Sequence, residues 1–169
     1  MTFISSFLSA AFSSSFLYKE LSIAMSNIDK FDEYAGRILG LLYNSFPVPM
    51  DLAVPEVLDL AEMYNDGGLP PECDEDFSIA ACTISWLQDA GYINFKGSNG
   101  CDFFLSVLTE KGLEVLKSTP ESLSPSSASL GQQINSTMKA GGKEVLRALV
   151  NQAFAIGIKI MAHRAGYPA

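Results

Sequence analysis

The stretch "GYINFKGSNGCDFFLSVLTEKGLEVL" (residues 91–116) decides the fold class. It contains two segments typical of β-strands, Tyr92 to Phe95 and Phe103 to Leu108, separated by the turn sequence KGSNG. Thr109 follows the second strand, and threonine is a common N-terminal cap of helices. The stretch therefore predicts a β-hairpin that runs directly into a helix.

Three helices are expected before this hairpin. Apolar residues recur at intervals of three and four in the first helix, which we expect Asn27 to cap. Two prolines in the sequence FPVPMDL end this helix and leave a short extended piece, after which Pro55 opens the second helix. The third helix is predicted over Phe77–Ala90, with Asp76 as its cap and Gly91 at its end.

The order helix, short strand, helix, helix, hairpin, helix resembles that of the winged helix-turn-helix superfamily. The sequence "TISWLQDAGYINF" (residues 83–95) looks like the end of a recognition helix running into the wing. Likewise, "LTEKGLEVL" (residues 108–116) resembles the Leu-Thr-x-x-Gly start of the closing helix in bacterial winged-helix regulators. The whole layout is loosely similar to a bacterial winged-helix family of unknown function with a C-terminal helix, sometimes found in phage and mobile-element neighbourhoods. The resemblance implies a mainly α (α+β) fold with a small β-hairpin wing.

Four segments organise the 169-residue chain. They are a leader over residues 1–24, a winged-helix domain over 26–118, a Ser/Pro-rich linker over 119–132 and a C-terminal amphipathic helical segment over 133–165. The natural start is either Met1 or Met25. No uninterrupted apolar run approaches the roughly 20 residues of a membrane-spanning helix, so we expect no spanning segment. Three cysteines without CxxC spacing suit reduced thiols, and we expect a cytoplasmic protein.

The sequence contains no pattern typical of an enzyme. His163 is the only histidine and lies near the chain end, so a nucleophile with a histidine base is not indicated. The acidic runs ECDED and FDEY are interpreted as solvated helix caps, and GSNG as a hairpin turn, not a phosphate loop. The cysteines and the histidine lack the spacing of a zinc site. We therefore expect a non-enzymatic protein with no metal and no cofactor.

The charge distribution argues against the DNA binding that the resemblance would imply. The chain has a net charge of -8, and the segment from Asp29 to Glu121 holds 17 acidic and 5 basic residues. DNA-binding proteins supply Lys and Arg to the phosphates, yet the predicted third helix contains neither. Lys96 is the only cation of the predicted wing. DNA is thus possible but disfavoured as a partner.

The outward face of the third helix is the predicted partner site. Helical geometry with Ile84 buried places Ile79, Cys82 and Trp86 on that face. Trp86 is the only tryptophan, and a tryptophan in an exposed apolar patch typically anchors a protein partner. The alternative is that another part of the same chain, such as the C-terminal helix, covers it.

The leading hypothesis is a protein-interaction or adaptor module whose partner is an unidentified protein. The rival is a DNA-binding transcriptional regulator that uses Lys96, Ser98 and Asn99 of the wing together with the basic C-terminal segment. A third possibility is a component of a phage-defence or toxin-antitoxin system.

The C-terminal segment carries a broad apolar stripe on one helical face. Its members are Leu146, Leu149, Val150, Ala153, Phe154, Gly157 and Ile160. Such a stripe is buried against the rest of its own chain, against a second subunit or against a membrane surface. We favour packing in a homodimer.

Overall fold

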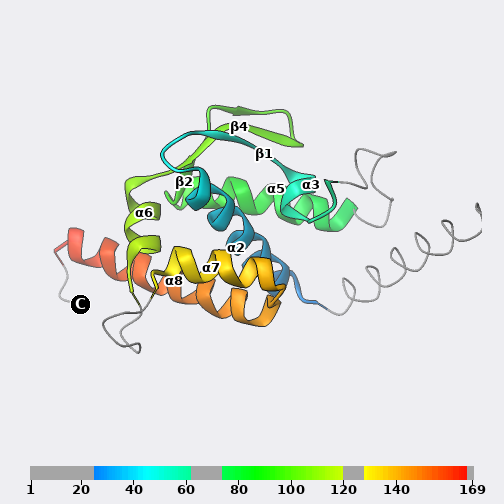
Figure 1. The fold of residues 1–169 in the computed structure, drawn as a ribbon. Coiled ribbons are helices and arrows are strands. Elements are labelled where there is room, and N and C mark those ends of the chain that lie inside the picture. Colours follow the sequence, from blue (N-terminus) through cyan, green and yellow to red (C-terminus); the bar gives the residue numbers. More distant parts are fainter. Residues whose placement is uncertain (1–24, 62–73, 120–127, 167–169) are drawn as a thin grey trace, which may run out of the picture.

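The computed structural model describes residues 25–61, 74–119 and 128–166 (Figure 1). This part of the chain is a mainly helical α+β structure with six helices and a small antiparallel sheet of four strands. The helices are α2 (Asn27–Ser45), α3 (Val54–Val57), α5 (Asp74–Asp89), α6 (Glu110–Lys117), α7 (Leu130–Ala140) and α8 (Lys143–Arg164). The strands are β1 (Met50–Ala53), β2 (Ile93–Asn94), β3 (Gly97–Ser98) and β4 (Asp102–Leu108). The predicted leader, Cys73 and most of the predicted linker lie outside the described residues.

Helix α2 forms the centre of the structure, because it contacts α5 as well as α7 and α8 (Figure 1). Ile38, Leu39 and Leu42 are fully buried in the core. The predicted cap Asn27 is wrong by one residue. Ser26 is the cap: its hydroxyl accepts a hydrogen bond from the Asp29 amide at 3.2 Å, and the Asp29 carboxylate accepts one from the Ser26 amide at 3.2 Å. This reciprocal capping box satisfies two backbone donors, which Asn27 one position later would not do.

The sheet is built on β4, which pairs with each of the other strands. The predicted hairpin is confirmed by the antiparallel pairing of β2 with β4, in register Ile93 with Leu108. The extended piece between the prolines and Pro55 is β1, which pairs with the other end of β4. The first hairpin strand, β2, is shorter than predicted. The predicted tip contains β3, because pairing with β4 continues there, beginning with the hydrogen bond from the Lys96 amide to the Phe104 carbonyl.

Helix α5 begins at Asp74, three residues earlier than predicted, so Asp76 is not its cap. Asp76 lies inside the helix and is buried, and its Oδ1 is 2.7 Å from Nζ of Lys30 on α2. The buried ammonium draws the carboxylate toward α2, because neither charge is stable alone in the interior. The predicted end at Gly91 is confirmed by its left-handed φ of 75°. Thr109 is confirmed as the cap of α6, since its hydroxyl accepts from the Gly112 amide.

The C-terminal segment contains two helices where one was predicted. Helix α7 begins at Leu130, inside the predicted linker, because Ser129 and Gln132 form a second capping box. It ends at Gly141, whose left-handed φ of 71° reverses the chain into α8. Both helices pack on α2 and on each other.

The apolar stripe of α8 is buried within its own chain, which corrects the favoured destination in a homodimer. Leu146, Leu149, Val150, Ala153 and Gly157 are buried, while Phe154 and Ile160 are partly buried. The close packing of α8 on α2 depends on Gly36 of α2, where a Cβ would lie 2.7 Å from Cδ1 of Leu146 and 2.8 Å from Cγ2 of Val150. A dimer formed through this stripe would require α8 to leave α2.

Among the described residues, α8 has the length and apolar composition that would let it cross a membrane, whereas no spanning segment was expected. Core helices that pack inside a protein meet the same criteria, and about a quarter of the most apolar part of α8 is buried here.

Candidate functional site

The three predicted partner-binding residues lie together on the outer face of α5. Ile79, Cys82 and Trp86 line one groove of about 320 Å³, and Phe31 of α2 forms its other side. Their helical spacing explains this arrangement, since Ile84 and Leu87 on the opposite face are fully buried in the core. The outward face predicted from periodicity is confirmed.

Trp86 is held by aromatic rings from two other helices. Its ring lies edge-on to Phe31 of α2, with 5.0 Å between centroids, and to Phe154 of α8, with 5.4 Å between centroids. Even so, 45% of the Trp86 surface is exposed. Each of the two interpretations of Trp86 is therefore partly met: the C-terminal helix covers one side of the indole, and the other side faces solvent.

The groove offers an apolar surface with one reactive group. The Thr83 hydroxyl donates to the Ile79 carbonyl at 2.7 Å, so this polar group is satisfied within the helix. Cys82 is an exposed free thiol. Helix α5 contains no Lys or Arg, and Glu75 near its N-terminus is 70% exposed. A partner would thus meet apolar carbon and sulfur beside negative charge.

The alternative nucleic-acid residues Lys96, Ser98 and Asn99 are exposed on the hairpin, as predicted. The side chain of Asn99, however, forms the turn itself. Its Oδ1 accepts from the amides of Cys101 and Asp102 at 2.9 and 2.7 Å, and its Nδ2 donates to the Asp102 carboxylate at 2.9 Å. The amide of Asn99 would have to give up these bonds in order to read a base.

Most basic residues of the C-terminal segment form ion pairs with acidic residues of the same chain. Lys143 pairs with Glu33 at 3.0 Å, and Arg147 pairs with Asp29 at 3.2 Å. Arg164 pairs with both Glu110 and Glu114. Within the described parts of the chain, Lys139 and Lys159 are the cations of this segment that form no ion pair. Few charges therefore remain for phosphates.

Several acidic residues that were predicted to be solvated caps are buried. Asp32 accepts a hydrogen bond from Asn151 at 2.8 Å, and Glu33 pairs with Lys143 at 3.0 Å in addition to its neighbour Arg37. The prediction was wrong because the α7–α8 hairpin brings partners from more than 100 residues away, and local sequence carries no signal of that approach. These carboxylates are committed to ion pairs and hydrogen bonds that hold α2 to α8.

The described residues contain no cluster of three or more histidine, cysteine or acidic side chains arranged to hold a metal ion. The carboxyl group of Asp29 on α2 and the amine of Lys111 on α6 have shifted pKa values. Hydrogen bonds from the side chain and backbone of Ser26 lower the pKa of Asp29, and burial lowers the pKa of Lys111. Neither residue lies in the groove on α5.

No family model matches this chain, and no match was found among curated proteins or among solved structures.

Proposed function

We propose that this protein is a winged-helix interaction module that binds a protein partner through the groove on α5. One observation carries the proposal: a tryptophan with 45% of its surface exposed stands in an apolar groove on a helix that has no cation. The winged-helix assignment is supported by the order α2, β1, α3, α5, hairpin, α6 and by the pairing of β1 with β4. In that arrangement α5 occupies the position of the recognition helix.

The aromatic contacts of Trp86 suit it to the role of an anchor. Phe31 and Phe154 hold the indole from α2 and α8, so little side-chain freedom remains to be lost when a partner covers it. Tryptophan surrounded by apolar contacts is a frequent centre of binding energy in protein interfaces. Ile79 and Cys82 extend the apolar surface along one side of the ring.

The charges beside the groove define the chemistry of the partner. Glu75 and Asp89 are exposed near the two ends of α5. We infer that the partner inserts an apolar side chain at Trp86 and carries Lys or Arg on either side of it, because opposite charges at an interface rim favour association. The same acidic residues repel the phosphates of a duplex.

The experiment uses the exposed thiol of Cys82 as a site for a photo-crosslinker, in the full chain with Cys73 and Cys101 changed to serine. We expect one host protein to be crosslinked, and the purified pair to form a stoichiometric complex. The matched control has Cys82 changed to serine as well and carries the same label at Ser98→Cys on the hairpin, outside the groove; it should not give this product.

Two variants separate loss of the groove from loss of the fold. Trp86→Ala should abolish the complex, and so should Cys82→Arg, which places a bulky cation at an exposed position without touching the core. Lys96→Gln should leave binding unchanged. Retention of the complex by both groove variants, or salt-dependent retardation of a promoter fragment by sub-micromolar protein, would overturn the proposal in favour of the DNA-binding regulator.

A further inference from the structure

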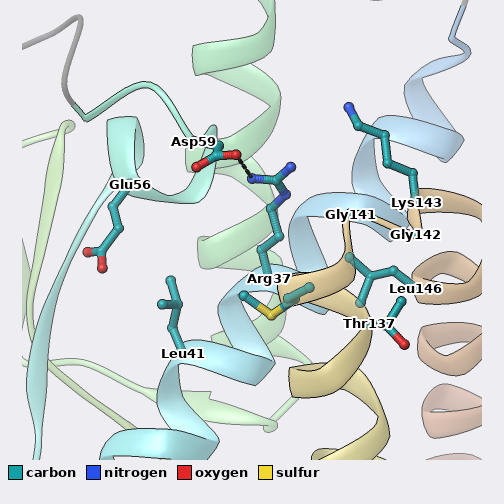
Figure 2. Close-up of a pocket in the computed structure, with 10 residues that line it drawn as sticks. Arg37, Leu41, Glu56, Asp59, Thr137, Gly141, Gly142, Lys143 and Leu146 are labelled. Carbon is teal, nitrogen blue, oxygen red and sulfur yellow. Dashed lines mark ion pairs between the residues drawn. The ribbon is translucent and has the colours of Figure 1, made fainter.

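A second cavity, separate from the groove on α5, lies where the turn between α7 and α8 meets α2 and α3 (Figure 2). Its volume is about 410 Å³. Arg37 from α2 and Lys143 from the start of α8 supply positive charge to its wall. Two acidic residues also line it, Glu56 of α3 and Asp59 at the turn after α3. Figure 2 shows Arg37 extended toward Asp59, with Leu41 and Leu146 below it.

The two cations of this cavity share one buried carboxylate. Oε1 of Glu33 is 3.0 Å from Nη2 of Arg37 and also 3.0 Å from Nζ of Lys143. The Glu33 side chain is almost completely buried. One negative charge between two positive ones leaves an excess of positive charge on the inner wall.

Two exposed carboxylates of the lining lie on the α3 side of the cavity: Glu56, which forms no ion pair among the described residues, and Asp59, which forms a weak pair with Arg37. Nη1 of Arg37 is 3.7 Å from Oδ2 of Asp59, and the Asp59 side chain is 84% exposed. Ion pairs of this length with one partner in water contribute little, since water and salt screen them. An anion that enters the cavity can therefore replace Asp59 at the guanidinium at low cost.

The rest of the cavity wall suits a ligand with both a charged and an apolar part. Leu41, Met138 and Leu146 supply apolar surface. The adjacent first turn of α8 has no side-chain cap, because its N-cap residue is Gly142. The positive end of the helix dipole adds to the field of Arg37 and Lys143.

We propose that this cavity binds a small organic anion. Its carboxylate or phosphate group takes the place of Asp59 at Nη1 of Arg37 and reaches Nζ of Lys143, and its apolar part covers Leu41, Met138 and Leu146. The site does not depend on the groove on α5 or on its partner.

The test is a titration of the isotope-labelled full chain by NMR at fixed ionic strength, with hexanoate and hexyl phosphate as probes. We expect saturable shifts of the amides of Gly141, Gly142 and Lys143. Lys143→Gln should weaken binding by about tenfold or more, the effect of losing a charged hydrogen bond. Lys139→Gln is the matched control, since this exposed lysine on α7 does not line the cavity.

Asp59→Asn distinguishes a ligand site from a purely structural ion pair. Asparagine tolerates the left-handed φ of 63° at this position, so the variant should fold. It removes the competing carboxylate and should tighten binding by about threefold, in line with the small worth of an exposed pair. Stronger binding of hexanoate or of hexyl phosphate would identify the head group.

Three results would overturn the proposal. They are hexanol binding as tightly as the anions, shifts that do not saturate or that centre on Lys139 and Lys159, and a loss of affinity in Asp59→Asn.

Discussion

Removal of the Asp76 carboxylate tests whether the Lys30–Asp76 ion pair fixes α5 on α2. Nζ of Lys30 and Oδ1 of Asp76 are 2.7 Å apart, and their side chains are 4% and 2% exposed. Asp76→Asn keeps the shape of the side chain and leaves the buried ammonium without its nearest counter-charge. The other carboxylate near Lys30 is that of Glu75, at 3.9 Å, and it is 70% exposed.

The distance and burial set the size of the expected effect. Two unit charges at this separation attract by about 6 kcal/mol at an effective dielectric constant of about 20. The cost of taking both charges out of water offsets much of this attraction. Removing one partner of a buried pair typically destabilises a protein by about 3–5 kcal/mol, because the other charge is left buried without a partner. Because Glu75 can compensate in part, we expect a loss of about 3 kcal/mol from the free energy of unfolding. The whole free energy of unfolding of a natural protein domain is only about 5–15 kcal/mol.

Trp86 provides the assay, because it is the only tryptophan and lies on α5 itself. Urea unfolding of the full chain, followed by its fluorescence, gives the free energy of unfolding for each variant. Glu75→Gln is the matched control and should change this energy by less than about 0.5 kcal/mol. The double variant Lys30→Met with Asp76→Leu should recover much of the loss, since neither charge is then left unpaired. A loss below about 1 kcal/mol in Asp76→Asn, or a double variant no more stable than the single one, would refute the reasoning.

Three further predictions follow from close contacts and from one pKa. Gly112→Ala should cost about 2 kcal/mol or more in urea unfolding, because its Cβ would overlap the backbone carbonyl of Tyr92, which cannot rotate away. Gly157→Ala should cost less in the same assay, since its Cβ would meet the hydroxyl end of the Tyr92 side chain, and equal losses would contradict this ranking. The pKa of Asp29 is lowered from its ordinary value of 3.8, so its ionised carboxylate stabilises the fold above about pH 3.8. This contribution is lost as the pH falls from there through the lowered pKa of the folded state. Asp29→Asn and Ser26→Ala should therefore flatten the acid limb of a stability–pH curve, and an unchanged limb would exclude this carboxylate as its cause.

Much of the local structure could be predicted because neighbouring residues determine it. The hairpin, the Thr109 cap and the Gly91 stop depend on residues only a few positions apart. The outward face of α5, with Cys82 and Trp86, follows from helical periodicity alone. Boundaries failed where a competing cap lay close by, as Ser26 does beside Asn27.

Of the candidate site, only the part contributed by α5 could be predicted from the sequence. Periodicity places Trp86 on the surface of α5, but it cannot show that Phe31 and Phe154 meet the indole from two other helices. The anion cavity had no signal in the sequence, since Arg37 and Lys143 converge on Glu33 only after the α7–α8 hairpin has packed on α2.

The amino-acid sequence by itself determined the order of the main helices and of the hairpin up to α6, the Thr109 cap and the absence of cations from α5. Only the tertiary structure decided which charges are buried and what the stripe of α8 covers. The physical reason is that a carboxylate near a helix start can serve either as a solvated cap or as half of a buried pair. Which of the two forms depends on whether a distant cation arrives, as Lys30 does for Asp76 and Lys143 does for Glu33.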